Sequence, residues 1–225
     1  MTLKLNGSTS GSVSIEAPAS TTNGDPFTLT LPVDDGTANQ WLQTDGSGNL
    51  TWANSPNIKE VVAFQCDGGA YSTSNGDITA PAITGTYLPT TSWVDVAGSI
   101  VSYQPPSGTT AVIYEFNMQV GSKDAHGIQH FKAYIDDVEV VYQRFTISGN
   151  SQLNQGYNYK LVIPIGGTAD TDTGRQASWS SAKELKLKTR IYNTSNETRM
   201  YGAYYWDGSA SDTFRQPNIQ LTAIG

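Results

Sequence analysis

The sequence contains one cysteine, few charged residues and no long apolar run, and each absence excludes a class of protein. An intrachain disulfide cannot form, because Cys66 has no second cysteine to pair with, and this fits folding in a reducing cytoplasm. No apolar stretch approaches the roughly 20 residues that span a bilayer, so we expect no membrane insertion. The N-terminal residues lack the continuous apolar core of a signal peptide, so we expect no secretion signal.

Basic residues are also few. The chain has 13 Lys and Arg against 20 Asp and Glu, which gives a formal net charge of −7. Because an acidic field attracts neither nucleic acid nor an anionic membrane, we expect neither partner. Only 15% of the residues are charged, unlike the composition of a disordered chain. Abundant Thr, Tyr and Val with Gly, Ser and Asn at turns predict an all-β fold of many short strands.

The pattern of strands changes at residues 54–57, "NSPN". Before this point the predicted strands are short: "TLKLNG", "GSVSIEAPA", "FTLTLP", "QWLQT" and "LTWA". Turns are predicted at Asp34–Gly36 and Asp45–Asn49. Each strand is too short, and its apolar face too narrow, to build an independent core. We therefore expect residues 1–55 to form an extension that needs partner chains, and residues 56–225 to form a separate domain.

Residues 56–225 are expected to form a β-sandwich of the jelly-roll type. About nine longer strands are predicted, with turn signals between them: "IKEVVAFQC", "WVDVAGSIVSY", "TAVIYEFNMQVGS", "IQHFKAYID", "VEVVYQRFTIS", "YNYKLVIPIG", "KELKLKTRIYNT", "TRMYGAYYW" and "PNIQLTAIG". One hairpin should turn at Asp136-Asp137 and another at Asn196. Alternation of apolar residues predicts a strand in "KELKLKTRI" where a helix is the other interpretation. Longer loops are expected at 67–90 and 166–180.

Histidines and acidic turns raise the question of a metal site. His126 and His130 share one face of a helix or a strand, with Asp124 nearby, but no glutamate lies between them and no cysteine pair is close. The turns at Asp34–Gly36 and Asp45–Asn49 lack the alternating carboxylates and distal glutamate of a calcium loop, and Asp-Gly is itself a hairpin signal. We therefore expect no metal and no cofactor.

Catalytic motifs are also missing. The sequence has no nucleotide-binding glycine pattern and no Gly-x-Ser-x-Gly, and Cys66 has no histidine beside it in the sequence. A glycosidase needs two carboxylates at a defined separation, which leaves Asp77, Asp95 and Glu115 open as candidates. Scattered acids are common on β proteins, so we expect no catalytic residues.

Aromatic residues gather near the C-terminus, in Tyr157, Trp179, Tyr201, Tyr204, Tyr205 and Trp206. Rings beside Asp and Asn can combine stacking with hydrogen bonding in sugar-binding surfaces. Strand alternation, however, turns about half of such rings into the core. We favour core and subunit contacts over a ligand site for these residues.

The stretches "GSTSGSVSIEAPA" and "FTLTLPVDDGTANQWLQTDGSGNLTWA" closely resemble a segment common in virion appendage proteins of tailed bacteriophages, especially marine ones. The matching positions are Leu31, Pro32, Gly36, Thr37, Gln40, Thr44, Asp45, Gly46, Gly48, Leu50 and Trp52. The match covers about the first quarter of the chain. The resemblance implies a segment that attaches to the capsid or tail and buries its rings between chains. It implies these chain-to-chain or attachment contacts: Trp41, Trp52, Leu29, Leu31 and Leu50.

Residues 58–225 are similar to the trimeric jelly-roll heads of the tumour-necrosis-factor and complement-head type, which recur at phage fibre tips. The similarity lies in the number of strands, in "MYGAYYW" and in the ending "PNIQLTAIG". It implies a homotrimer whose C-terminal strand lies in the inner sheet near the three-fold axis. Such heads bind through variable loops, so no functional residue is carried over.

Together the two resemblances imply a non-enzymatic virion structural protein, made in the host cytoplasm: a tail fibre, head fibre or capsid decoration protein. The alternative is a phage spike depolymerase or glycosidase that cleaves host polysaccharide. A head that binds a host-surface glycan or protein would use loops at the end away from Asn54, which we take to be 67–90 and 166–180. The expected contacts are Tyr71, Tyr87, Trp179, Asp77, Asp172 and Arg175. Equally, these loops could fill clefts between subunits.

Overall fold

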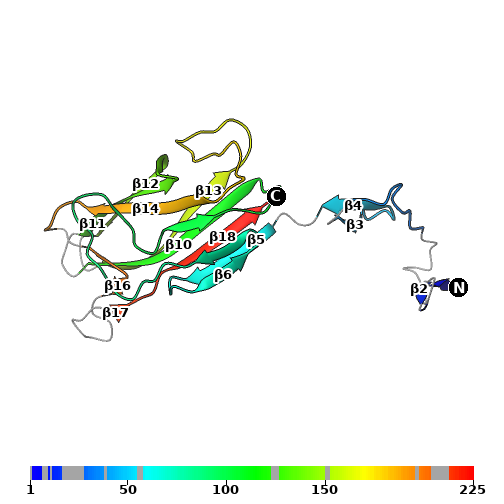
Figure 1. Ribbon diagram of the computed structural model, residues 1–225, viewed down its shortest axis with the longest axis horizontal. Coiled ribbons are helices and arrows are strands. Elements are labelled where there is room, and N and C mark those ends of the chain that lie inside the picture. The colour runs from blue at the N-terminus through cyan, green and yellow to red at the C-terminus, as the bar shows by residue number, and fades with distance from the viewer. Residues whose placement is uncertain are drawn as a thin grey trace. The chain divides into compact units, whose positions relative to one another are not determined.

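The chain folds into two compact units, Met1–Pro56 and Asn57–Gly225, in a computed structural model. The structure describes residues 2–6, 10, 12–16, 28–37, 40–54, 58–122, 127–149, 153–195, 198–203 and 213–225 (Figure 1). Over these ranges every regular element is a strand. No helix there is long and apolar enough to cross a membrane. The predicted all-β fold is confirmed.

The described part of the N-terminal unit contains two pairs of short strands. Strand β1 (Thr2–Asn6) pairs with β2 (Ser12–Glu16), and β3 (Gln40–Thr44) pairs with β4 (Leu50–Asn54). All four strands coincide with segments that alternation predicts.

The strand predicted in "FTLTLP" does not form in its described part, residues 28–32. Thr30 makes an isolated bridge to Asn49: its N–H donates to the Gly48 carbonyl and its carbonyl accepts the Leu50 N–H. A ladder cannot continue from there, because Pro32 has no N–H to donate.

The second unit, Asn57–Gly225, contains two larger antiparallel sheets. The first sheet has the order β13 (Leu153–Pro164), β10 (Ala111–Ser122), β18 (Asn218–Ile224) and β5 (Ile58–Gln65), and β15 (Arg199–Met200) also pairs with β10. The second sheet has the order β12 (Val138–Gly149), β11 (Gly127–Ile135), β14 (Lys183–Ile191) and β8 (Val94–Asp95), and β9 (Val101–Tyr103) also pairs with β14. A small hairpin joins β6 (Ala70–Thr73) to β7 (Gly76–Thr79), and β16 (Gly202–Ala203) pairs with β17 (Thr213–Phe214).

The strand order is that of an eight-stranded jelly roll. When β8 and β9 are counted as one interrupted strand, the long strands are numbered one to eight along the chain. The first sheet then reads one, eight, three, six, and the second reads two, seven, four, five. Consecutive strands therefore alternate between the sheets, except for strands four and five, which pair as a hairpin in the second sheet. This is the order of two Greek keys, and the second unit is a β-sandwich.

One hydrophobic core lies between the two sheets. Burial alternates strictly along β11, so that every second side chain points inward. A stack of rings crosses the sandwich: Phe131 lies on Phe145 at 4.6 Å between ring centroids, and Phe145 lies on Tyr159 at 5.3 Å. Stacked pairs of this kind contribute beyond their buried area.

Turn geometry confirms one predicted hairpin and contradicts another. Asp136 and Asp137 have φ values of 47° and 63°, so both residues adopt the left-handed conformation that a tight type I′ turn needs. The second hairpin was expected to turn at Asn196, which lies outside the described residues. Its outgoing strand β15 pairs with β10 in the first sheet and not with β14, so this hairpin is not formed.

Candidate assembly surfaces

The predicted Asp45–Asn49 turn is closed by its own side chains. One carboxylate oxygen of Asp45 accepts the Ser47 N–H at 2.7 Å, and the other accepts the Asn49 side-chain amide at 2.7 Å. These hydrogen bonds lower the pKa of Asp45. The carboxylate is therefore used by the turn, which explains an Asp-Gly-x-Gly-Asn sequence without a cation.

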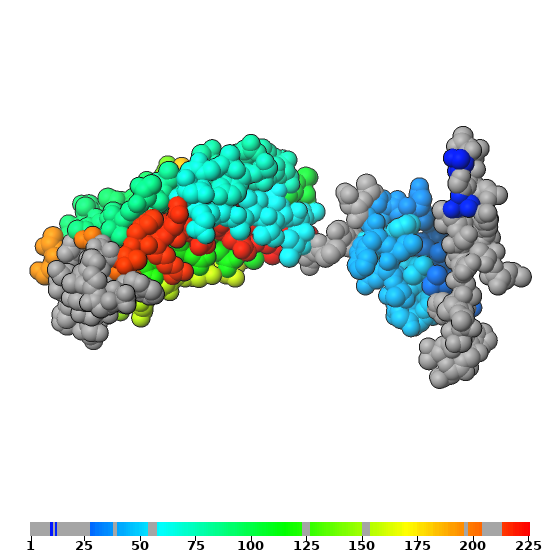
Figure 2. Space-filling view, turned by 90° about the horizontal axis from the view of Figure 1, so that it is seen from below, coloured from blue at the N-terminus to red at the C-terminus, as the bar shows by residue number. Residues whose placement is uncertain are grey.

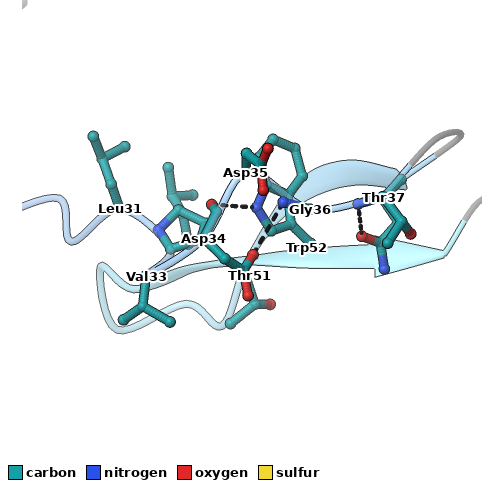
Figure 3. Close-up of a pocket in the computed structure, with 11 residues that line it drawn as sticks. Leu31, Val33, Asp34, Asp35, Gly36, Thr37, Thr51 and Trp52 are labelled. Carbon is teal, nitrogen blue, oxygen red and sulfur yellow. Dashed lines mark hydrogen bonds between the residues drawn. The ribbon is translucent and has the colours of Figure 1, made fainter.

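Trp52 holds the preceding loop against β4. Its indole N–H donates to the Asp34 carbonyl at 3.0 Å, and its ring lies against Gly36 (Figure 3). A Cβ at Gly36 would stand only 2.7 Å from the ring, and φ there is +70°, so the position requires glycine. The Thr37 N–H donates to the Gln40 side-chain oxygen at 2.7 Å. The residues of the N-terminal motif thus contact one another within a single chain.

This structure leaves large apolar side chains on its surface. Leu31 is 67% exposed and Trp41 is 51% exposed, and Leu29, Val33 and Leu42 are exposed as well. Leu31 and Val33 project on opposite sides of the chain (Figure 3). A groove of about 640 Å³ runs between the 31–37 loop and β4, and Leu50 and Trp52 are partly buried along it. Large exposed apolar side chains of this kind make the segment a candidate interaction site.

The predicted contact residues therefore divide into two groups. Trp52 and Leu50 are partly buried within the chain, whereas the side chains of Leu29, Leu31 and Trp41 are 49%, 67% and 51% exposed. The sequence motif does not show this division, because both tryptophans occupy similar strand positions.

The first sheet of the second unit carries apolar rows on its outer face. Figure 2 shows β18, in red, beside β5, in cyan, on this side of the unit. In the order β5, β18, β10 and β13, the first row is Ile58, Ile224, Ala111 and Pro164, and the next is Val61, Thr222, Ile113 and Val162. Val61 is 52% exposed and Val162 is 48% exposed. We call these eight residues the apolar rows.

The same face becomes polar away from the apolar rows. The next two rows are Ala63, Gln220, Glu115 and Lys160, then Gln65, Asn218, Asn117 and Asn158. Their polar groups bond to one another: Lys160 lies 3.0 Å from Glu115, and the Asn117 amide donates to Asn218 at 2.8 Å. The apolar rows are therefore the part of this face that gains most from being covered.

A second apolar region lies at one edge of the sandwich. Strands β12 and β13 are edge strands of the two sheets, and a groove of about 310 Å³ lies between them. Its lining includes Tyr142, which is 69% exposed, together with Phe145 and Tyr157. We call this region the edge groove. Exposed edges with large apolar side chains are prone to pair with another chain.

The 67–90 segment is not the open loop that the sequence predicts, because it contains the β6–β7 hairpin. The hairpin tip lies beside β5 and the 104–110 loop: the Ser74 N–H and hydroxyl both donate to Glu60, and the Asn75 amide donates to the Pro105 carbonyl at 2.9 Å. This contact puts the tip at the end of the sandwich where β5 begins.

The 166–180 loop reaches the same end of the sandwich. The Ile165 N–H donates to the Thr110 carbonyl at 2.7 Å, and the Gln104 amide donates to the Ser180 carbonyl at 3.1 Å. Both loops were expected at the end away from Asn54, yet Asn54 precedes β5 by only four residues. The expectation is therefore wrong for the 166–180 loop and for the β6–β7 tip, whereas Tyr87 bridges to Met200, which pairs with Val120 near the other end of β10.

The three rings expected to stack on a receptor pack within the second unit. Tyr71 stacks on Phe64 at 5.0 Å, and Tyr87 meets Tyr201 at 5.7 Å. Trp179 is buried, and its indole N–H donates to the Tyr103 carbonyl at 3.1 Å. Burial of this kind leaves Trp179 without a free ring face in this conformation.

The expected polar contacts also do not converge on one place. Asp77 accepts a hydrogen bond from Ser72 on the β6–β7 hairpin, whereas Asp172 and Arg175 lie on the 166–180 loop. The Arg175 guanidinium donates to the Gly166 carbonyl of its own loop at 3.2 Å. A receptor role for these residues stays a prediction.

Two of the other candidate residues lie in the described part of the chain. Tyr201 is fully buried, and His130 lies on β11. Outside the described residues lie His126, Tyr204, Tyr205 and Trp206. His130 has its Nδ1 2.9 Å from the Thr146 hydroxyl, and burial followed by the Arg190 charge lowers its pKa.

The carboxylates considered for catalysis are engaged elsewhere. Asp95 faces Lys188 on the second sheet, and Glu115 pairs with Lys160 on the first. Because these two acids lie on opposite outer faces of the sandwich, they cannot flank one glycosidic bond.

Comparison with known proteins gives little further information. No family model matches the chain, and no curated protein matches it. Among solved structures, "Structure of infectious bursal disease virus Gx strain" is similar at 10% identity with a TM-score of 0.33. The similarity covers 78% of this chain, which spans 40% of that chain's length. A TM-score this low supports no inference about function.

Proposed function

We propose that the protein is a homotrimeric structural component of a bacteriophage virion, of the fibre or capsid-decoration type. In this proposal the N-terminal unit attaches to the capsid or tail and the jelly-roll head is displayed. The observation that carries the proposal is the N-terminal motif. It resembles virion appendage segments, and here it closes on itself while leaving Leu29, Leu31 and Trp41 exposed. Attachment through these side chains accounts for an apolar surface on an otherwise polar segment.

The head offers two apolar surfaces that suit a closed ring. A cyclic trimer needs heterologous contacts, in which one patch of each subunit meets a different patch of the next. The apolar rows and the edge groove are two such patches on one subunit. Packing of the edge groove against the apolar rows of a neighbour would cover Val61 and Tyr142 together. Three such contacts would close the ring.

The proposal assigns no catalytic role to the chain. Its support is the separation of the acids, since Asp95 and Glu115 each pair with a lysine on opposite faces. The rival is a spike depolymerase. Incubation with host surface polysaccharide distinguishes the two: release of reducing ends, lost when one or two carboxylates are changed to amides, would favour the depolymerase.

Sedimentation of the full chain tests the assembly. We expect a species of three times the 24.2 kDa chain mass. A folded monomer at micromolar concentration would contradict the homotrimer. Labelled antibody against the protein, applied to intact particles, then tests the location on capsid shell, vertex or tail. Absence of label from purified particles would contradict a virion role even if the trimer forms.

A further inference from the structure

The outer face of the second sheet gathers cationic side chains in an acidic protein. Five of the chain's 13 Lys and Arg residues lie there, on β11, β12 and β14: Lys132, Arg144, Lys186, Lys188 and Arg190. Three of these residues, on β11 and β14, are aligned by the strand register, in which Lys132 faces Lys188 and His130 faces Arg190. The two pairs are separated by two residues along each strand and therefore share a face.

Four of these five cations have an acidic partner. Lys132 and Arg144 both pair with Glu139, at 2.9 and 2.5 Å. Lys186 pairs with Asp137 and Glu184, each at 2.6 Å, and Lys188 faces Asp95 at 3.6 Å. These pairs leave one member of the set to account for.

Arg190 is that member. Among the residues that the structure describes, no carboxylate lies within ion-pair distance of it, and its buried Nε–H has no acceptor. Buried donors of this kind are rare, because an unmade hydrogen bond to a charged group is costly. His130 lies across from Arg190 in the strand register, and burial followed by the Arg190 charge lowers its pKa.

Trp93 holds the cations in position. The Lys132 ammonium lies 4.7 Å from the centroid of its ring and the Arg190 guanidinium lies 5.3 Å from it. Tyr134 lies 5.1 Å from Lys188 in the same way. Cation–π contacts at these distances restrict the side chains without neutralising their charge. Trp93 is thus a positioning residue for a positive surface that is already ordered.

We propose that Arg190 and His130 bind a carboxylate or sulfate group of an acidic polysaccharide on this face. A guanidinium fork suits a planar or tetrahedral anion, and Lys132 and Lys188 flank the site. A nucleic acid fits less well, because its continuous phosphates would meet Glu139 and Asp95 on either side and a net charge of −7 beyond them. An acidic polysaccharide carries its charges on separate sugar units, so one charge can reach Arg190 while its neighbours stay away from Glu139 and Asp95.

The inference goes beyond the assembly proposed above and does not depend on it. The site lies within one subunit, on the face of the sandwich opposite the apolar rows. A trimer built from the apolar rows and the edge groove covers the first sheet and the β12 edge of the second, and leaves Arg190, on β14, outside the contact.

Binding of the full chain to immobilised polysaccharides tests the site. The probes are polygalacturonate, which carries carboxylates, dextran sulfate, which carries sulfates, and neutral dextran. We expect binding to at least one polyanion and none to dextran. Arg190→Gln should weaken binding about tenfold or more, as loss of a charge-assisted hydrogen bond predicts. Arg144→Gln is the matched control, because it makes the same change on the same sheet at an arginine paired with Glu139. Arg144 also lines the edge groove, so the control is read only where sedimentation shows unchanged assembly, and its affinity should then change by less than about twofold.

Two conservative variants, Arg190→Lys and His130→Gln, keep the proposal testable if Arg190→Gln does not fold. Circular dichroism and sedimentation check that each variant keeps its fold and assembly. Both should weaken binding, because the first loses the fork and the second loses one hydrogen bond. Failure of the intact chain to bind either polyanion would overturn the proposal, as would equal losses from Arg190→Gln and Arg144→Gln. Tighter, Arg190-dependent binding of duplex DNA would assign the site to nucleic acid instead.

Discussion

At the scale of single residues, Gly36 shows why the N-terminal motif requires glycine at a given position. Gly36→Ala forces a left-handed backbone, which costs roughly 1–2 kcal/mol, and puts a Cβ against the Trp52 ring. Gly46→Ala is the matched control, since φ there is +79° but the space is open. We expect Gly36→Ala to destabilise the β3–β4 hairpin by about 1 kcal/mol more than the control, as overpacking predicts. Hydrogen exchange of residues 40–54 measures the difference, and equal protection in both variants would contradict the contact.

Cys66 offers a second prediction at this scale. Burial raises the pKa of its thiol to about 12, and the thiol donates to the Gly98 carbonyl. At pH 8 the folded protein should react with iodoacetamide on the order of 1000-fold more slowly than the denatured chain, because the thiolate is the reactive form. Below pH 9 the thiol is protonated in both states, so it adds no pH dependence to stability. Above pH 9 the unfolded state loses its proton first, and stability falls. Rapid alkylation of the native protein would disprove the burial.

At the scale of elements, local alternation predicts the long strands because their burial alternates. Strand β11 alternates strictly, and the Asp136-Asp137 turn is a local signal of the same kind. The strand expected in "TRMYGAYYW" is interrupted, and the alternation of apolar residues does not predict the interruption. Tyr201 has a φ of 64° and ends the strand after Met200, and its buried hydroxyl donates to the Ala97 carbonyl more than 100 residues away. A distant contact therefore decides the local conformation.

The β3–β4 hairpin gives its two tryptophans different functions. Trp52→Ala should unfold the hairpin, because it removes the indole bond to Asp34 and the ring that lies on Gly36. Trp41→Ala should leave the hairpin folded and weaken attachment or assembly, because Trp41 is half exposed. Hydrogen exchange reports the first effect and sedimentation reports the second, with the head folded in both variants. Equal unfolding by the two substitutions would show that Trp41 is also structural.

At the scale of the whole molecule, the apolar rows could not be predicted from the sequence. Val61, Ile113 and Val162 lie about 50 residues apart along the chain, and each is one apolar residue in an ordinary alternating strand. Only the register of four strands brings them into one row. The assembly contacts expected from the sequence were N-terminal residues, aromatic residues, loops and the C-terminal strand, and of these only the C-terminal strand contributes to the apolar rows. The separation of Asp95 from Glu115 could not be predicted from the sequence either, because the distance between two acids depends on which sheet each strand joins.

The apolar rows supply the sharpest test of assembly. Val162→Lys places a charge on the outer face of β13, where a single subunit leaves the side chain 48% exposed. The isolated head should tolerate this lysine, because its ammonium reaches water, but a trimer that buries the rows should not, because a charge desolvated without a partner costs several kcal/mol. Val138→Lys is the matched control: Val138 is 49% exposed and begins β12 in the other sheet. We expect sedimentation to show monomers for Val162→Lys and trimers for Val138→Lys, with matching circular dichroism spectra. If Val162→Lys remains trimeric while Val138→Lys dissociates, the interface lies on the second sheet, and the apolar rows are not its surface.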